Sequence, residues 1–188
     1  MPRRQRVQVQ FNNRLILFKY FLHLFGKETL QGLAGNLNGQ DYEGLDDNQN
    51  TYFWRYLDRL CATNSEAMQR INRDSLKIYD EHICKYVKHI GERRGGIVLK
   101  YFQYISLLFT EIYLDRYFSD KYAFLADLNS FIDKVSADTE GAVNITHYTL
   151  DTMNKLAFMS ATGSGKTLIM HINILQFLYY LKRSNRLS

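Results

Sequence analysis

Hydrophobic residues recur at helical spacing through the first three quarters of the chain, and this pattern predicts a mainly α-helical region. Residues 14–25 form an apolar-rich segment that stops before Gly26, a residue type common just after a helix. An aromatic-rich segment over 51–61 predicts a second, short helix. Residues 63–66 (Thr-Asn-Ser-Glu) have the spacing of a capping box, so a third helix is expected to begin there and to run to Gly91 or to the break at 93–96.

The segment over 99–118 has the most regular pattern, and it predicts an amphipathic helix that packs on one face. Ser119 is placed to cap a further helix over 120–135. Residues 136–149 lack a helical period, so a domain boundary is expected there. The apolar side of the 99–118 segment carries Phe102, Ile105, Phe109 and Ile112, and its polar side carries Lys100, Tyr104, Glu111 and Asp115.

These patterns divide the chain into a helical accessory domain over 1–137, a linker over 138–154 and the start of an α/β domain over 155–188. Residues 156–159 are a short apolar run, as in a buried parallel strand. A long apolar helix is expected from Thr167 onward. The predicted fold class is therefore mainly α, with a helical domain followed by one strand–loop–helix unit.

Composition narrows the class of protein. The chain has 188 residues, of which 46% are apolar, and this content is enough for a folded core and excludes wholesale disorder. Two cysteines, Cys61 and Cys84, do not make a disulfide scaffold, so a reduced, cytoplasmic protein is expected. The longest apolar stretch, 97–114, contains Lys100 and Glu111, so no membrane span is expected.

The net charge of +5 is concentrated at one end of the chain. Five of the 24 basic residues and none of the 19 acidic residues lie in 155–188, so the first 154 residues hold 19 of each. The first 154 residues therefore show no bulk electrostatic preference for nucleic acid. The balanced charge does not exclude a local basic patch, for example at residues 3–6 or 93–94.

Residues 162–167 read Thr-Gly-Ser-Gly-Lys-Thr, the core of a phosphate-binding loop between the predicted strand and helix. Glycines at 163 and 165 allow a tight turn that brings successive backbone amides toward phosphate oxygens. Lys166 is suited to reach the β- and γ-phosphates, and Thr167 offers a hydroxyl to Mg²⁺. The full pattern asks for glycine at position 160, where this chain has Ser160. The alternative is a chance glycine turn before a helix.

Residues 159–167 resemble motif I of superfamily 2 helicases and translocases, and most closely the motors of type III and type I restriction enzymes. Motif I of those motors commonly reads Met-Ala-Thr-Gly-(Ser/Thr)-Gly-Lys-Thr, which also lacks the leading glycine. The resemblance covers about 30 of the 188 residues. It implies ATP binding by Ala161, Thr162, Gly163, Ser164, Gly165, Lys166 and Thr167, with Lys166 and Thr167 as the catalytic residues and Thr167 holding Mg²⁺ through ATP.

The same resemblance implies an N-terminal fragment of an ATP-dependent DNA helicase or translocase, ending within a truncated RecA-like domain. The implied partners are double-stranded DNA and a methyltransferase or other defence-system subunit. In such motors an acidic motif and an arginine follow further along the chain, so residues 1–188 alone are expected to lack ATP turnover. Two alternatives stay open: a helical protein-interaction module with an idle loop, and another class of phosphate-loop NTPase.

Two further groups are weaker candidates. Asp80, Glu81 and His82 resemble part of an acidic motif, but they precede the loop, and Asp80 and Glu81 are interpreted as a solvated helix face. His82, Cys84 and His89 match no standard zinc spacing, so no metal site is expected.

The aromatic and basic clusters are also given a structural rather than a functional interpretation. The aromatic residues around Trp54 are expected to fill a core rather than to stack on bases. Arg93 and Arg94 are expected in a solvated turn rather than on a phosphate backbone.

Overall fold

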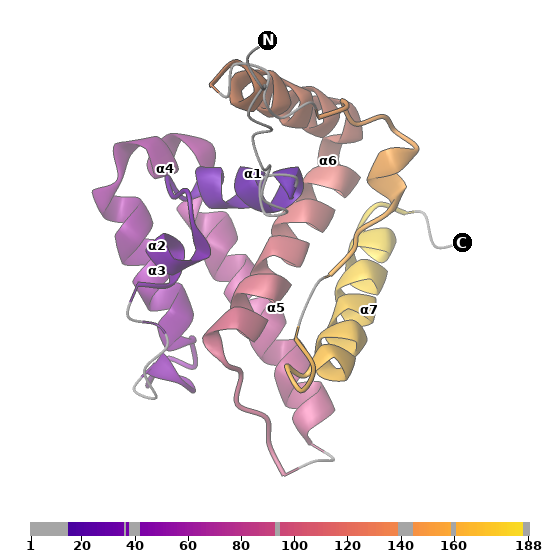
Figure 1. The fold of residues 1–188 in the computed structure, drawn as a ribbon. Coiled ribbons are helices and arrows are strands. Elements are labelled where there is room, and N and C mark those ends of the chain that lie inside the picture. Colours follow the sequence, from indigo (N-terminus) through magenta and orange to yellow (C-terminus); the bar gives the residue numbers. More distant parts are fainter. Residues whose placement is uncertain are drawn as a thin grey trace.

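The computed structural model describes residues 15–35, 37, 42–92, 95–138, 145–158 and 161–185. The fold is mainly α-helical, which confirms the predicted class at that level (Figure 1). The helices in chain order are α1 (Ile16–Leu24), α2 (Leu30–Ala34), α3 (Tyr52–Thr63), α4 (Ser65–Arg70), α5 (Arg73–Gly91), α6 (Tyr101–Asp138), the 3₁₀ turn η3 (Thr152–Asn154) and α7 (Lys166–Arg183). Among these described helices, none is long and apolar enough to cross a membrane.

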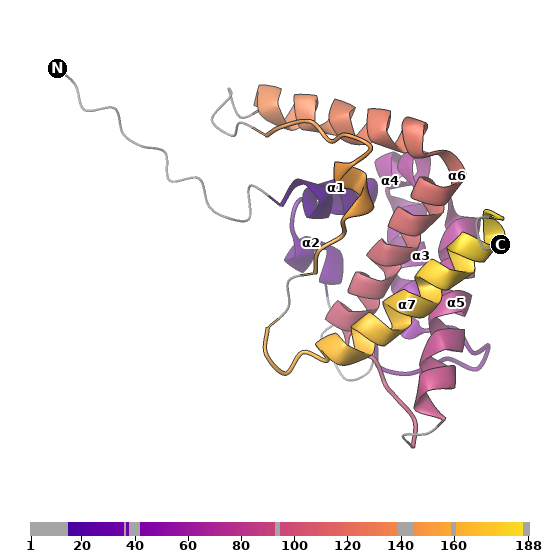
Figure 2. The ribbon, with the colours of Figure 1, turned by 90° about the vertical axis from the view of Figure 1, so that its right-hand side faces the viewer.

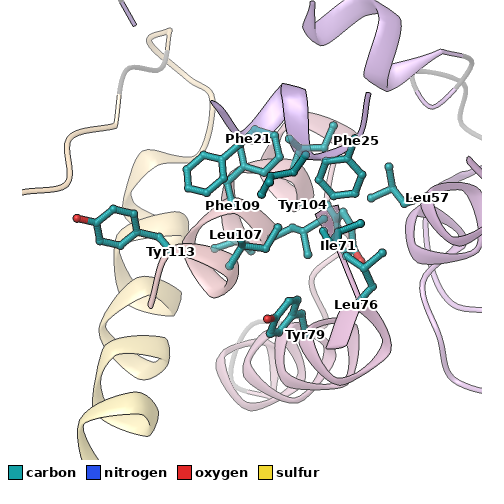
Figure 3. Close-up of a cluster of buried hydrophobic side chains, with 14 of the residues drawn as sticks. Phe21, Phe25, Leu57, Ile71, Leu76, Tyr79, Tyr104, Leu107, Phe109 and Tyr113 are labelled. Carbon is teal, nitrogen blue, oxygen red and sulfur yellow. The ribbon is translucent and has the colours of Figure 1, made fainter. Parts of the chain in front are cut away.

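The first half of α6 is the central element of the fold, and α1, α5 and α7 pack around it (Figures 1 and 2). Figure 3 shows Phe109 and Leu107 of this helix among side chains from α1, α3 and α5. The prediction that 99–118 packs on one face is wrong, because Tyr104 and Glu111 of the supposed polar side are fully buried. Neighbouring helices cover this part of α6 on several sides, so its buried surface is wider than one apolar stripe.

The helix α6 changes direction at Asp120, whose backbone is extended (φ −151°, ψ 93°). The Asp120 Oδ1 atom accepts hydrogen bonds from the backbone amides of Tyr122 and Ala123, each at 3.0 Å. The cap predicted at Ser119 is therefore wrong by one residue. The helix predicted over 120–135 is confirmed as the second half of α6. Its apolar residues Phe124, Leu128 and Ile132 are buried, and Phe131 is half-buried.

Local signals decide the other helix ends. Gly26 has a φ of +63°, and its amide and the following one bond back to the carbonyls of His23 and Leu22, as in a Schellman motif. The predicted capping box at 63–66 is wrong, because Asn64 caps α4 through its Oδ1 atom. The third predicted helix is also divided, since Asn72 caps the separate helix α5.

The segment over 155–158 has no strand conformation, contrary to the strand predicted over 156–159, of which position 159 lies outside the described residues. A parallel strand is held by hydrogen bonds to its neighbours, and the described residues contain only one isolated bridge, between Leu45 and Thr51. In place of a sheet, α7 packs against α5 and α6, and its residues Ile169 and Ile172 belong to the hydrophobic core.

Candidate phosphate-binding loop

The loop before α7 has the backbone shape that its glycines allow. Gly163 and Gly165 have φ angles of +78° and +83°, in the left-handed region. The Ser164 amide donates to the Ala161 carbonyl at 3.3 Å, which closes a tight turn. Gly165 is the N-cap residue of α7, so the helix begins directly at Lys166 (Figures 1 and 2).

The two glycines are needed for different reasons. A Cβ atom at Gly163 would meet nothing within 4 Å, so only its backbone conformation favours glycine. A Cβ atom at Gly165 would lie 2.5 Å from the Gln103 Nε2 atom, which is closer than real Cβ contacts come. Glycine at position 165 therefore also makes room for a side chain from α6.

The start of α7 is electrostatically unfavourable on its own. Its N-cap residue, Gly165, has no side chain to accept from the first amides, and its first turn contains no acidic residue. Lys166 instead places a positive charge at the positive end of the helix dipole. The last turn follows the usual preference, with Lys182 and Arg183 at the negative end. An anion bound at the first turn would remove this mismatch.

The structure brings the seven predicted site residues together in one surface turn. Ala161, Thr162 and Gly163 are exposed, as are the side chains of Lys166 and Thr167, while Ser164 and Gly165 are half-buried. Met159 and Ser160, where the motif departs from the full pattern, lie outside the described residues. The described loop is therefore accessible to a ligand from solvent.

Gln103 is a site residue that sequence reasoning missed. Its Nε2 atom donates to the Ser164 carbonyl at 2.9 Å, and its Oε1 atom accepts from the Lys100 backbone amide at 2.9 Å. The second bond is one half of a capping box at the start of α6. Because Lys100 is not a typical cap residue, the local sequence signal for this capping box is weak, and the contact between Gln103 and Ser164 spans 61 positions.

A buried carboxylate fixes α7 on the helical body. Glu111 of α6 is fully buried, and its Oε2 atom accepts from the Tyr180 hydroxyl at 2.6 Å. The Gln176 Nε2 atom donates to Glu111 Oε1 and to the Leu107 carbonyl, each at 2.9 Å. His82 Nδ1 of α5 lies 3.3 Å from Glu111 Oε2. Burial, with the Glu111 carboxylate beside it, raises the pKa of Tyr180 well above its ordinary value.

The interpretation of Asp80 as part of a solvated helix face is wrong, although Glu81 is exposed as expected. Asp80 is fully buried and accepts from the Thr51 amide at 3.0 Å, the Thr51 hydroxyl at 2.5 Å and the Tyr104 hydroxyl at 2.8 Å. Burial raises the pKa of Asp80, and these three hydrogen bonds oppose that rise. The carboxylate therefore joins α3, α5 and α6 in the core.

The candidate metal ligands do not converge. The His82 ring faces Glu111, while the Cys84 thiol lies 3.9 Å from Asp80 Oδ2 and His89 is exposed. Within the part of the chain that the structure describes, no group of three or more His, Cys, Asp or Glu residues is placed to hold a metal ion. Burial raises the pKa of the Cys84 thiol to about 12 and that of Cys61 to about 11.

The aromatic cluster of α3 and the basic residues at 3–6 and 93–94 are the remaining candidates from the sequence. Phe53 is buried, and its ring centroid lies 5.1 Å from that of Tyr104, in keeping with a core role for the aromatic cluster of α3. Neither 93–94 nor the basic residues at 3–6 lie among the described residues.

Two cavities lie elsewhere on the molecule. One, of about 540 Å³, is lined by residues around the α4–α5 junction, including Arg70, Arg73 and Arg116. These arginines are paired with Glu66, Asp58 and Asp127 respectively. The second cavity, of about 590 Å³, lies between α5 and the segment over 95–99.

Comparisons of this chain with protein-family models, with curated proteins and with solved structures find no match. A functional assignment therefore rests on the loop geometry and on the resemblance of 159–167 to motif I.

Proposed function

We propose that residues 161–167 bind the phosphates of ATP together with Mg²⁺. The observation that carries the proposal is the pair of left-handed glycines directly before the uncapped first turn of α7. This arrangement leaves backbone amides and a helix dipole for an anion, and the Gly-Lys-Thr sequence adds the side chains that a nucleotide phosphate requires.

Each residue has a distinct role in this proposal. The amides of Gly163 and Gly165 hold the phosphate oxygens, and the Lys166 ammonium contacts the β- and γ-phosphates. The Thr167 hydroxyl contacts the Mg²⁺ ion that accompanies ATP. Both side chains are exposed at the start of α7, from which they reach a ligand without rearrangement of the core.

On the resemblance to motif I, we further propose that the chain is the ATP-binding part of a helicase or translocase acting on double-stranded DNA. In that setting the loop and α7 are the beginning of a RecA-like domain, and the helical region is an accessory domain that contacts DNA, a methyltransferase or another defence-system subunit. The thiols of Cys61 and Cys84 are free, which agrees with the reducing cytoplasm proposed for such a protein.

The proposal is tested by titrating the purified chain with ATP–Mg²⁺ in a calorimeter. Lys166→Ala should weaken binding about tenfold or more, because it removes a charged contact to the phosphates. Lys182→Ala is the matched control, since it removes the same charge from the other end of α7. Wild-type protein that does not bind ATP–Mg²⁺, or Lys166→Ala that binds as tightly as wild type, would refute the proposal.

The same samples separate binding from turnover. Residues 168–188 contain no Asp or Glu, so no acidic motif follows the loop there to orient the attacking water. We therefore expect this chain to bind ATP–Mg²⁺ without hydrolysing it. Phosphate release by wild-type protein that is lost in Lys166→Ala would contradict this expectation.

The outer face of α7 favours a second candidate function, a helical protein-interaction module with an idle loop. Met170, Ile174, Phe177 and Leu178 are between 39% and 52% exposed on this helix. An apolar helix face of this kind is typical of a surface that another protein element covers. If titration with ATP releases or absorbs no heat, and ADP likewise shows no sign of binding, the interaction module is the better explanation.

A further inference from the structure

The Ser164–Gly165 peptide group contacts the helical body directly. The Gln103 Nε2 atom donates to the Ser164 carbonyl, and Gln103 itself is only 9% exposed. Its other terminal atom is fixed by the Lys100 amide, so the side chain is held at both ends of its amide group. The donor therefore has a defined position before any ligand binds.

A trans peptide group has its carbonyl and its amide on opposite sides, and the described residues contain no cis peptide. Because the Ser164 carbonyl points to Gln103, the Gly165 amide points away from Gln103. The Gln103 side chain lies so close to Gly165 that it would have to move to admit a Cβ atom at this position. The orientation of this peptide is therefore set by α6 rather than by the loop alone.

We propose that Gln103 is a positioning residue that aims the Gly165 amide at the bound phosphate. This inference rests on the proposed function of the loop. Gln103 does not touch the ligand, and it acts by keeping one peptide group in the orientation that an anion requires. A loop that is already oriented loses less conformational freedom when it binds, so the hydrogen bond contributes to affinity.

Two substitutions at this position separate the loop contact from the helix cap. Gln103→Glu keeps an oxygen that accepts from the Lys100 amide but has no N–H for the Ser164 carbonyl. Gln103→Leu removes both contacts without adding a charge. The defect that the two variants share is the lost donor to Ser164. Thr110→Val is the control, since it removes a buried hydrogen bond to the Ser106 carbonyl in the same helix, away from the loop.

The experiment measures ATP–Mg²⁺ affinity and the Gly165 amide resonance in ¹⁵N spectra of the ligand-free chain. Both Gln103 variants should bind about three- to tenfold more weakly than wild type, the effect of one hydrogen bond. Both should also shift the Gly165 resonance, while Thr110→Val changes neither readout. A structural role alone would lower thermal stability in all three variants without moving this resonance.

Three results would overturn the inference, and they differ from one another. If Lys166→Ala loses binding while both Gln103 variants bind as wild type, Gln103 has no positioning role and the proposed function stands. If only Gln103→Leu is weakened, the α6 cap matters and the Ser164 contact does not. If wild-type protein does not bind ATP–Mg²⁺, the proposed function and this inference fail together.

Discussion

Asp80 and Glu111 are fully buried carboxylates whose hydrogen-bond donors come largely from other helices. An ionised carboxylate in a core is strongly destabilising unless its oxygens are hydrogen-bonded. Asp80 receives three hydrogen bonds from Thr51 and Tyr104, and Glu111 receives two from Gln176 and Tyr180. Each donor is therefore worth more to stability than an ordinary surface hydrogen bond.

Tyr104→Phe should lower the free energy of unfolding by about 2 kcal/mol at neutral pH, because it removes a donor from an ionised buried group. At acidic pH, where Asp80 is protonated, the loss should fall to about 1 kcal/mol. Urea denaturation at several pH values measures both numbers, with the exposed Tyr122→Phe as the control.

The sign of this pH dependence follows from the Asp80 carboxyl. Its pKa is raised in the folded protein above the ordinary value of 3.8, so its contribution to stability is full below pH 3.8 and falls as pH rises through the folded pKa. Tyr104→Phe removes a hydrogen bond to Asp80 that lowers the pKa of this carboxyl. The variant should therefore lose more stability than wild type as the pH rises. A mutational effect that is constant with pH would contradict the role of Asp80.

Neither buried carboxylate could be identified from the sequence. The two residues lie at helix positions that a one-faced pattern assigns to solvent, and their burial depends on partners 24 to 69 positions away. The residues of the candidate loop, by contrast, were found together because the motif is local. Gln103 has no such local motif, and only the packing of α7 on α6 brings it to Ser164.

At the scale of elements, helix ends depend on single polar side chains. Asp120→Ala should lower the free energy of unfolding by about 1 kcal/mol, since the Asp120 side chain caps the second half of α6. Ser119→Ala should change it by less than about 0.5 kcal/mol, because the Ser119 hydroxyl accepts an exposed hydrogen bond from Arg183. Chemical denaturation distinguishes the two, and a larger loss for Ser119→Ala would place the cap at Ser119.

Most helices were predictable to within a few residues, while the N-caps of α4 and of the second half of α6 were not. The Schellman end of α1 at Gly26 was found because glycine suits that position almost regardless of its surroundings. At α4 and at the break in α6, two candidate cap residues are adjacent in sequence, and the structure selects the second in each case, Asn64 and Asp120. Residue types alone do not choose between neighbours that can both accept hydrogen bonds.

At the scale of the whole molecule, α7 is an integral part of the core. Its inner residues Ile172, Gln176 and Tyr180 are fully buried against the body. The sequence predicts this helix as part of an incomplete α/β domain, because an apolar helix after a glycine-rich loop is typical of such domains. The described structure instead covers its inner face with α5 and α6.

Tyr180→Phe should lower the free energy of unfolding of the entire chain by about 2 kcal/mol, because it removes a donor from the buried Glu111 carboxylate. Thermal unfolding should show one transition at a lower temperature. Tyr179→Phe, at the neighbouring and exposed position, should stay within about 0.5 kcal/mol of wild type. A separate early transition in Tyr180→Phe would show that α7 unfolds independently of the body.

The hydrogen bond from Tyr180 to Glu111 also has a consequence for the order of events during synthesis. Glu111 leaves the ribosome 69 residues before the tyrosine that completes its hydrogen bonding. Until then, the groove that α7 will fill is open to water, and the carboxylate remains hydrated there. The helical body can therefore exclude water from around Glu111 only after α7 has been synthesised. A chain stalled before residue 176 would leave that groove exposed to chaperones.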